Sequence, residues 1–250
     1  MKKKLLSAIF ALFVCTNLYS QNIQLHYDFG KLLYNHLDNR QNATITFDMF
    51  KPDKWGSTYA FADFDFATDG MMGTYMEIER EFTVSRDGRW AAHIEYGGGI
   101  STGHVPEYCF GNRFRHTILA GAAWNWLSAD YSKNFSIKAL YKYVFKGKKG
   151  GMRPFSSFQT TMVWGINFLK NKCTFTGFLD AWYDPNVKGK VILTTEPQFW
   201  FNFNGLKKCE KFPLSVGTEV KINHNFVWNE NGENDKFYVI PTLALKWTFK

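Results

Sequence analysis

Charged and aromatic side chains recur at every second position in several segments of this chain. Residues spaced by two lie on one face of a β-strand, so such a segment has one polar face and one apolar face. A face that combines carboxylates, cations and flat rings can hydrogen-bond and stack against a small polar solute. The residues that we expect to form this binding surface are Tyr59, Phe61, Asp63, Asp65, Glu77, Glu79, Arg113, Arg115, Lys138, Lys142 and Trp200.

Catalysis is the other chemistry that these side chains could support. A lipid hydrolase or acyltransferase needs a serine beside a histidine, with a polar group that orients the ring. His26, His93, His116 and several serines are present, but they form no recognisable motif. The three glycines from Gly97 lack the Lys-Ser/Thr pair of a phosphate-binding loop. We therefore predict a protein that is not an enzyme and needs neither cofactor nor metal, and a lipid-modifying enzyme remains the alternative.

The elements that position these residues are predicted to be strands. Over residues 42–49 polar and apolar residues alternate, and the same period of two recurs over 135–145 and 214–222. Segments of this kind lie near 24–30, 42–50, 57–66, 73–83, 89–97, 113–126, 134–145, 155–168, 173–183, 191–203, 213–223 and 237–249. Their number is even and leaves no room for helices. The sequence thus predicts an all-β fold, a single antiparallel barrel of about twelve strands.

The lengths of these strands indicate a membrane protein. Many reach the roughly 9 to 11 residues that a tilted strand needs to cross a bilayer, whereas strands of soluble proteins average about 5 or 6. Aromatic residues make up 18% of the chain, which suits a barrel with an apolar outer surface. Residues 1–20 combine early lysines with an apolar stretch, the pattern of a secretory signal. We expect residues 21–250 to form a transmembrane barrel in the outer membrane of a Gram-negative-type bacterium.

The connections predict how the barrel is oriented. If both termini are periplasmic, the periplasmic turns are 51–56, 85–88, 128–133, 169–172 and 204–212. The outer loops are then 31–41, 98–112, 146–153 and 224–236, longer on average, as in bacterial barrels. The last strand places Leu243, Leu245, Trp247 and Phe249 on one face, similar to the aromatic-ended strand that outer-membrane assembly machinery recognises, although Lys250 follows.

The predicted inner face divides by charge. Strands one to five would direct inward Asp28, Asp48, Asp63, Asp65, Glu77, Glu79 and Glu95. Strands six, seven, eleven and twelve would direct inward Arg113, Arg115, Lys138, Lys142, Lys221 and Lys246. A field between two such walls would suit polar, uncharged or zwitterionic solutes. Alternatively, the charges pair across the lumen and plug it.

Two further features limit the choice of partner and of covalent cross-links. The formal net charge is +8, but three of the lysines lie in the first four residues, so nucleic acid is not expected as a partner. Cys173 and Cys209 both fall near predicted periplasmic turns, where an oxidising compartment permits a disulfide, and the sequence leaves that bond open.

A closed scaffold whose outer loops bind a partner is a third interpretation, with Trp228, Asn229, Asn231 and Asn234 as exposed candidates.

The stretch Phe47-Asp48-Met49-Phe50-Lys51-Pro52-Asp53-Lys54-Trp55-Gly56, followed by Tyr59-Ala60-Phe61-Ala62-Asp63-Phe64, resembles the start of Tsx-type nucleoside-specific channels. In that family a short turn with Trp and Gly precedes an aromatic strand that ends in Asp. The order of the later elements is similar over most of the chain, whereas the long segment 98–112 is not part of the likeness. The resemblance implies a monomeric barrel of twelve strands with a narrow lumen for nucleosides. It places Phe61, Asp63, Glu77 and Glu79 in that lumen.

Overall fold

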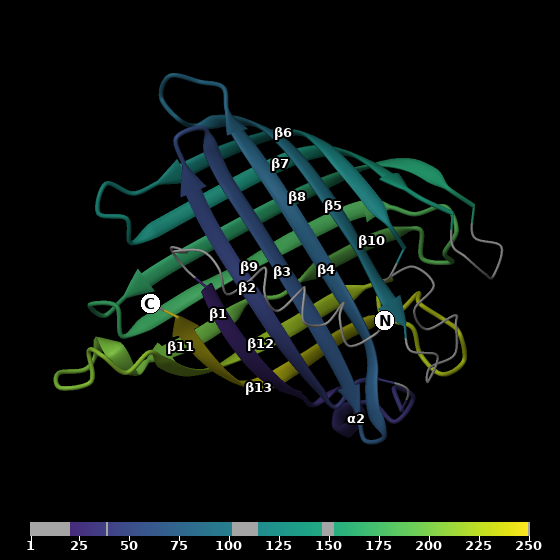
Figure 1. Cartoon of the computed structure of the whole chain (residues 1–250). Helices are drawn as coiled ribbons and strands as arrows, with labels where there is room; N and C mark the ends of the chain where they lie inside the picture. The colour runs from purple at the N-terminus through teal and green to yellow at the C-terminus, as the bar shows by residue number, and fades with distance from the viewer. Residues whose placement is uncertain (1–20, 39, 102–114, 147–152, 250) are drawn as a thin grey trace, which may run out of the picture.

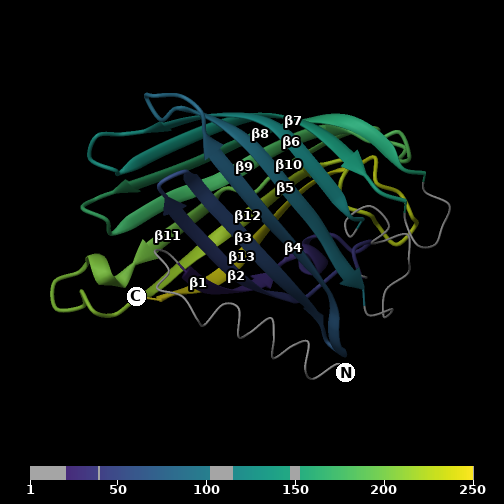
Figure 2. The ribbon, with the colours of Figure 1, turned by 45° about the horizontal axis from the view of Figure 1, so that its top comes forward.

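The sheet has no free edge, because each strand pairs with its neighbours in antiparallel fashion and β1 pairs with β13. The computed structural model describes residues 21–38, 40–101, 115–146 and 153–249. Its strands are β1 (Gln21–Asp28), β2 (Ala43–Asp53), β3 (Gly56–Ala67), β4 (Gly70–Thr83), β5 (Trp90–Ser101), β6 (Thr117–Leu127), β7 (Lys133–Val144), β8 (Phe155–Phe168), β9 (Cys173–Tyr183), β10 (Val191–Thr195), β11 (Gln198–Asn202), β12 (Leu214–His224) and β13 (Phe237–Phe249). Figures 1 and 2 show these strands inclined around a closed barrel.

The predicted antiparallel barrel of about twelve strands is confirmed. The structure has thirteen separate strands because Glu196 and Pro197 interrupt the tenth predicted strand, and β10 and β11 both pair with β9 and β12. Proline has no N–H for the ladder, so a break at Pro197 is physically reasonable. The expectation of no helices is wrong in detail, since α2 (Gly30–Leu33) and a short 3₁₀ turn at Phe203–Gly205 are present.

No helix in the described part of the chain is long and apolar enough to cross a membrane.

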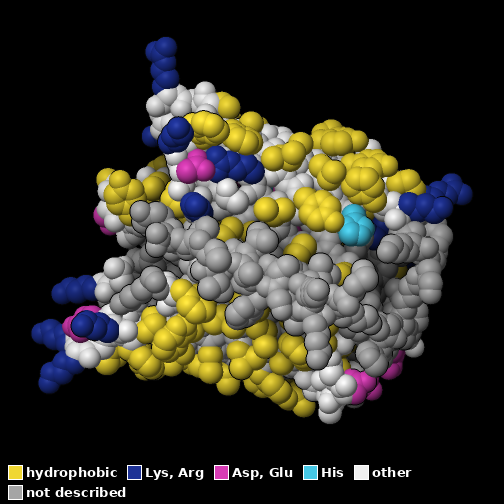
Figure 3. All heavy atoms as spheres, in the orientation of Figure 1, with side chains coloured by type: hydrophobic (Ala, Val, Ile, Leu, Met, Phe, Trp, Pro, Cys, Tyr) yellow, Lys and Arg dark blue, Asp and Glu magenta, His cyan; other side chains and the backbone are white. Residues whose placement is uncertain are grey.

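The outer surface of the barrel is apolar over most of its height. Large hydrophobic side chains point away from the lumen on nearly every strand and stay exposed, among them Leu25, Ile78, Ile94 and Leu243. In Figure 3 hydrophobic side chains cover much of the described part of the visible wall, and lysine and arginine lie mostly toward its two ends. Such a band matches the hydrocarbon core of a bilayer.

The two ends of the barrel differ in their connections. Gln21 pairs with Phe249, so the described chain begins and finishes at one end, which we call the terminal end. This end carries the turns between β2 and β3, β4 and β5, β6 and β7, and β8 and β9, together with the segment from β11 to β12. The opposite end, called the loop end, carries the longer connections, including residues 29–42 and 225–236. Residues 1–20, predicted as a signal, and most of the predicted loop 98–112 lie outside the described residues.

Cys173 and Cys209 are not bonded to each other. Cys173 is the first residue of β9 rather than part of a turn, and its side chain is buried. The disulfide that the sequence left open is therefore absent from this structure.

Candidate functional site

The inner face of the barrel carries more carboxylates than cations. Inward positions follow from the strand register, and their side chains are buried or half-buried. The inward carboxylates of the described strands are Asp28, Asp48, Asp63, Asp65, Glu77, Glu79, Glu81, Glu95, Asp180 and Glu219. The inward lysines of the same strands are Lys138, Lys142, Lys221 and Lys246. The strands that we expected to form the basic wall thus include one acid, Glu219 of β12, and carboxylates outnumber lysines on the inner face of the described strands.

An aromatic cluster lies within the acidic wall of β2, β3 and β4. The rings of Tyr59 and Phe61 have centroids 6.0 Å apart, and Phe61 lies 6.0 Å from Tyr75. The Tyr59 hydroxyl donates to Asp48 at 2.9 Å, and the Tyr75 hydroxyl donates to Glu77 at 2.5 Å. All five side chains are only half-buried, so rings and carboxylates together face space inside the barrel.

The wall opposite this cluster repeats the same chemistry on β9. Phe178, Asp180 and Trp182 occupy successive inward positions of that strand. Asp180 accepts a hydrogen bond from the Thr161 hydroxyl at 2.5 Å. The Lys142 ammonium lies 4.0 Å above the centre of the Trp182 ring, within the range of a cation–π interaction. A solute between the two walls would meet aromatic rings and carboxylates on both sides.

The terminal end of the lumen opens into a polar vestibule of about 500 Å³. Its lining consists mostly of amide and hydroxyl side chains, namely Asp130, Tyr131, Ser132, Asn167, Asn171, Thr174, Asn202, Asn204, Ser215, Lys246 and Thr248. Below it the Lys246 ammonium lies 4.0 Å over the ring of Trp200, which is fully buried. The indole donates to Gln198 at 2.9 Å, so Trp200 is held in one orientation at the base of the vestibule.

The loop end is narrowed by the connection between β1 and β2. Arg40 of this loop is bonded through its guanidinium to Asp28, with a shortest N–O distance of 2.7 Å. Leu37 of the same loop is 2% exposed and packs with Tyr238 and Ile240 of β13. Leu37 and Arg40 therefore lie against the inside of the barrel mouth, whereas Leu32 and Leu33 of α2 are exposed.

Most of the predicted site residues lie on the inner face of the barrel, and Arg115 is the exception among those that the structure describes. Tyr59, Phe61, Asp63, Asp65, Glu77, Glu79, Lys138, Lys142 and Trp200 all lie on the inner face. Arg115 does not lie on a wall strand, because β6 begins at Thr117 and not at residue 113. Its guanidinium instead donates to the carbonyl oxygens of Phe145 and Arg153, which ties the ends of a loop. Arg113 lies outside the described residues. Whether any of these residues binds a solute stays a prediction.

Several inward polar residues were not singled out from the sequence. Glu81 and Asp180 follow the period of two set by Glu79 and Phe178, so the alternation itself could have identified them. Arg40 carries no such signal, because a loop residue has no period that fixes its direction.

In the part of the chain that the structure describes, His26, His93 and His116 do not have the contacts needed for acyl transfer. His93 contacts Glu81 and Glu95, and His26 contacts Gln24 and Thr242. His116 lies 2.6 Å from the hydroxyl of Tyr96. In the described ranges, none of the hydrogen bonds of these rings involves a serine, so a serine–histidine pair is not formed there.

A family model matches nearly the whole sequence of this chain. This family model, described as a domain of unknown function, DUF5020, matches residues 20–249. The chain belongs to the DUF5020 family. The match covers every strand of the barrel, so the whole structure is that of the DUF5020 domain. The search of curated proteins found no match.

Solved structures share the fold of this DUF5020 protein at very low sequence identity. A NanC porin structure aligns with a TM-score of 0.56 and 11% identity, over 92% of this chain and 99% of that one. An outer-membrane channel named COG4313, from Pseudomonas putida F1, aligns with a TM-score of 0.51 and 7% identity, over 94% and 97% of the two chains. The DUF5020 protein therefore has the fold of an outer-membrane β-barrel.

Proposed function

We propose that this protein is a passive outer-membrane channel for small polar solutes and that it favours cationic and neutral solutes over anions. The observation that carries the proposal is the excess of inward carboxylates, several of them half-exposed beside aromatic rings. A narrow lumen with walls of low dielectric constant strengthens the field of these groups, so a cation gains and an anion loses free energy on entry.

Nucleosides are the specific solutes that we propose to test first. The rings of Tyr59, Phe61 and Tyr75 offer flat surfaces for a nucleobase, and stacking of a base on an aromatic side chain contributes about 1–3 kcal/mol. Carboxylates such as Asp63 lie beside them and can accept hydrogen bonds from ribose hydroxyls. The likeness to Tsx-type channels over residues 47–64 agrees with this choice.

The ion selectivity of single channels tests the proposal. Refolded protein in a planar bilayer under a KCl gradient should give a reversal potential of the sign expected for cation selectivity. The double variant Asp63→Asn, Asp65→Asn should move this potential toward zero. Asp87→Asn is the matched control, because Asp87 is an exposed carboxylate of a turn outside the lumen. Anion selectivity in the unmodified channel would contradict the proposal.

A closed barrel is the second candidate, because many inward side chains are nearly inaccessible. His26 is 3% exposed, Lys138 5% and Glu95 6%. The loop that carries Arg40 also narrows one mouth. A well-folded barrel that gives no current in the bilayer experiment would support this scaffold, whose outer loops would then bind the partner. Of the loop residues predicted to be exposed, Asn229 and Asn234 are in fact buried, at 3% and 1% exposed, which leaves the exposed Asn231 and the half-buried Trp228 as candidates.

We also propose how the chain reaches the membrane and in what state it acts there. Leu243, Leu245, Trp247 and Phe249 are exposed on the outer face of β13, where assembly machinery could bind them. Because the closed sheet leaves no strand edge to be paired, a monomer is sufficient. Sedimentation of the detergent-solubilised barrel should give the mass of one chain.

A further inference from the structure

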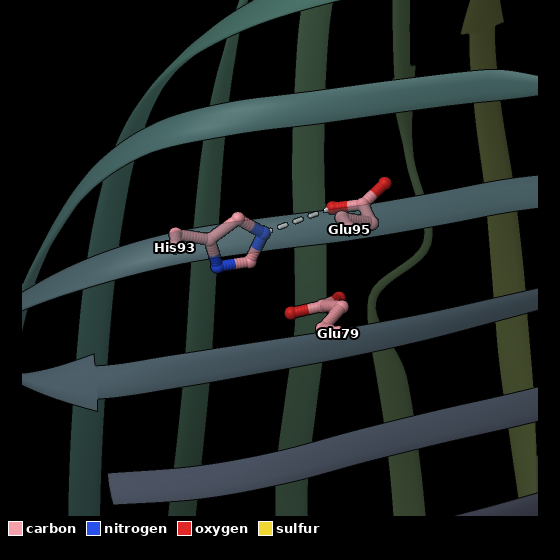
Figure 4. A group of neighbouring side chains, drawn as sticks. All are labelled: Glu79, His93 and Glu95. Atoms are coloured by element: carbon pink, nitrogen blue, oxygen red, sulfur yellow. Dashed lines mark hydrogen bonds and ion pairs between the residues drawn. The ribbon is translucent and has the colours of Figure 1, made fainter.

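Two acidic side chains and one imidazole converge on the inner wall of the barrel. Glu79 comes from β4, and His93 and Glu95 come from the adjacent strand β5. Their ligand atoms, one from each side chain, all lie within 4.8 Å of one another. Figure 4 shows the His93 ring edge facing Glu95, with the Glu79 carboxylate next to both. A metal ion placed among three such atoms needs only small side-chain movements.

Register explains why these residues meet, although Glu79 precedes His93 by 14 residues and Glu95 by 16. Glu79 lies directly opposite Glu95 in the β4–β5 ladder, and Glu81 lies directly opposite His93. Side chains directly opposite one another in an antiparallel pair have Cβ atoms about 4.5–5.5 Å apart. The four residues thus form a square on one face of two strands. No spacing within a single strand reveals such a site, which is why the sequence predicted no metal.

The contacts of the imidazole match those of a metal-ligating histidine. Its Nε2 faces Glu95 at 3.2 Å, and its Nδ1 faces Glu81 at 3.4 Å. In protein metal sites one ring nitrogen binds the ion while the other N–H donates to a carboxylate, which fixes the tautomer. Glu81 is in turn held by the amide of Asn125 at 2.7 Å. With Nε2 on the ion, Glu81 already occupies the place of that orienting carboxylate.

The carboxylates of the cluster outnumber its cations, so a divalent cation would neutralise the excess negative charge. Glu79, Glu81 and Glu95 are three carboxylates, and Lys138 contacts Glu79 and lies 3.7 Å from Glu81. His93 pairs with Glu81 and Glu95 as a cation only when its ring is protonated, so beside a neutral ring the cluster has two uncompensated negative charges. The side chain of His93 is fully buried, and those of the three glutamates are at most 14% exposed. Burying such a charge excess is unfavourable unless it is neutralised. One divalent ion together with Lys138 balances three carboxylates beside a neutral imidazole.

We propose that Glu79, His93 and Glu95 bind one divalent first-row transition-metal ion such as Zn²⁺ on the lumen wall, with Glu81 orienting His93. Imidazole with carboxylates is a donor set for such ions, whereas Mg²⁺ and Ca²⁺ prefer oxygen ligands alone. Lys138 holds Glu79 while the ion is absent and turns to Glu81 when the ion binds.

Direct metal binding by the whole folded barrel tests the proposal. The detergent-solubilised protein is dialysed against Zn²⁺ in excess Mg²⁺, and the bound metal is measured by mass spectrometry. One Zn²⁺ per barrel is expected, and its loss is expected in His93→Gln and in Glu95→Gln. His26→Gln is the matched control, because His26 is also a buried histidine on the inner wall but contacts Gln24 and Thr242. Heat-dependent mobility on denaturing gels shows that each variant is folded.

Two further variants separate a metal site from an ordinary ion-pair cluster. Glu81→Gln should weaken Zn²⁺ binding by about 10-fold or more, the usual effect of removing an orienting carboxylate. Lys138→Met should strengthen it, because the competing ammonium on Glu79 is lost. A folded barrel that retains no zinc, or that retains it equally in His93→Gln, would overturn the proposal. None of these measurements depends on whether the barrel conducts.

Discussion

Arg40 and Asp28 form a bidentate ion pair just inside the loop end of the barrel. The Arg40 Nε lies 3.0 Å from both carboxylate oxygens, and the terminal nitrogen lies 2.7 Å from one of them. The side chains are only 7% and 2% exposed. This pair fastens the loop between β1 and β2 to the end of β1, in addition to the packing of Leu37 against Tyr238 and Ile240.

Breaking the Arg40–Asp28 pair should therefore loosen the mouth. Arg40→Ala leaves a buried carboxylate without its cation, which typically costs about 3–5 kcal/mol. We expect a lower free energy of unfolding in urea and a larger single-channel conductance. Lys31→Ala is the control within the same loop, since Lys31 makes one hydrogen bond to Asn42. An unchanged conductance in a folded Arg40→Ala barrel would mean that this loop does not limit the passage.

The aromatic cluster makes a prediction about nucleoside affinity. Phe61→Leu removes the central ring of the cluster and should weaken block of the current by nucleosides about fivefold or more, the equivalent of at least about 1 kcal/mol of stacking. Phe64→Leu is the matched control, because Phe64 lies on the same strand but points outward and contacts Phe47. Equal block in both variants would remove the aromatic cluster from the binding site.

Alternation predicted most of the barrel but not the contacts between its strands. The alternation of polar and apolar residues fixes which face of its strand carries Phe61 or Lys138. A shift of the strand by one residue would turn its lumen-facing side chains to the lipid and its lipid-facing side chains to the lumen. The break at Pro197 and the start of β6 at Thr117 depend on local pairing that alternation does not describe. The meeting of Glu79 with His93 depends on the register between two strands, and the inward course of Arg40 depends on a loop. These features required the structure.

The hydrogen bonds of Asp130, in the turn between β6 and β7, predict that its carboxyl titrates at an unusually low pH. Hydrogen bonds from Ser128 and Ser132 stabilise its ionised form and lower the pKa of the Asp130 carboxyl from 3.8 to about 2. Because the folded pKa is lowered, this contribution to stability is complete above the unfolded value and is lost as the pH falls toward 2. A carboxyl titration followed by NMR should give this midpoint, and Ser128→Ala should raise it. A midpoint near 3.8 in the unmodified turn would show that these bonds do not persist in solution.

The position of Ile94 on the outward face of β5 predicts how strongly an arginine there destabilises the barrel in a membrane. Ile94 lies midway along the strand, is 50% exposed and points away from the lumen. Arginine at the bilayer midplane costs about 2–4 kcal/mol but only about 0–1 kcal/mol near the interfaces. Ile94→Arg should therefore lower the free energy of unfolding in lipid vesicles by about 2–4 kcal/mol. Val84→Arg is the control, because Val84 is exposed just beyond the end of β4 at the terminal end. Equal losses in the two variants would contradict the placement of Ile94 near the bilayer midplane, because arginine costs most there.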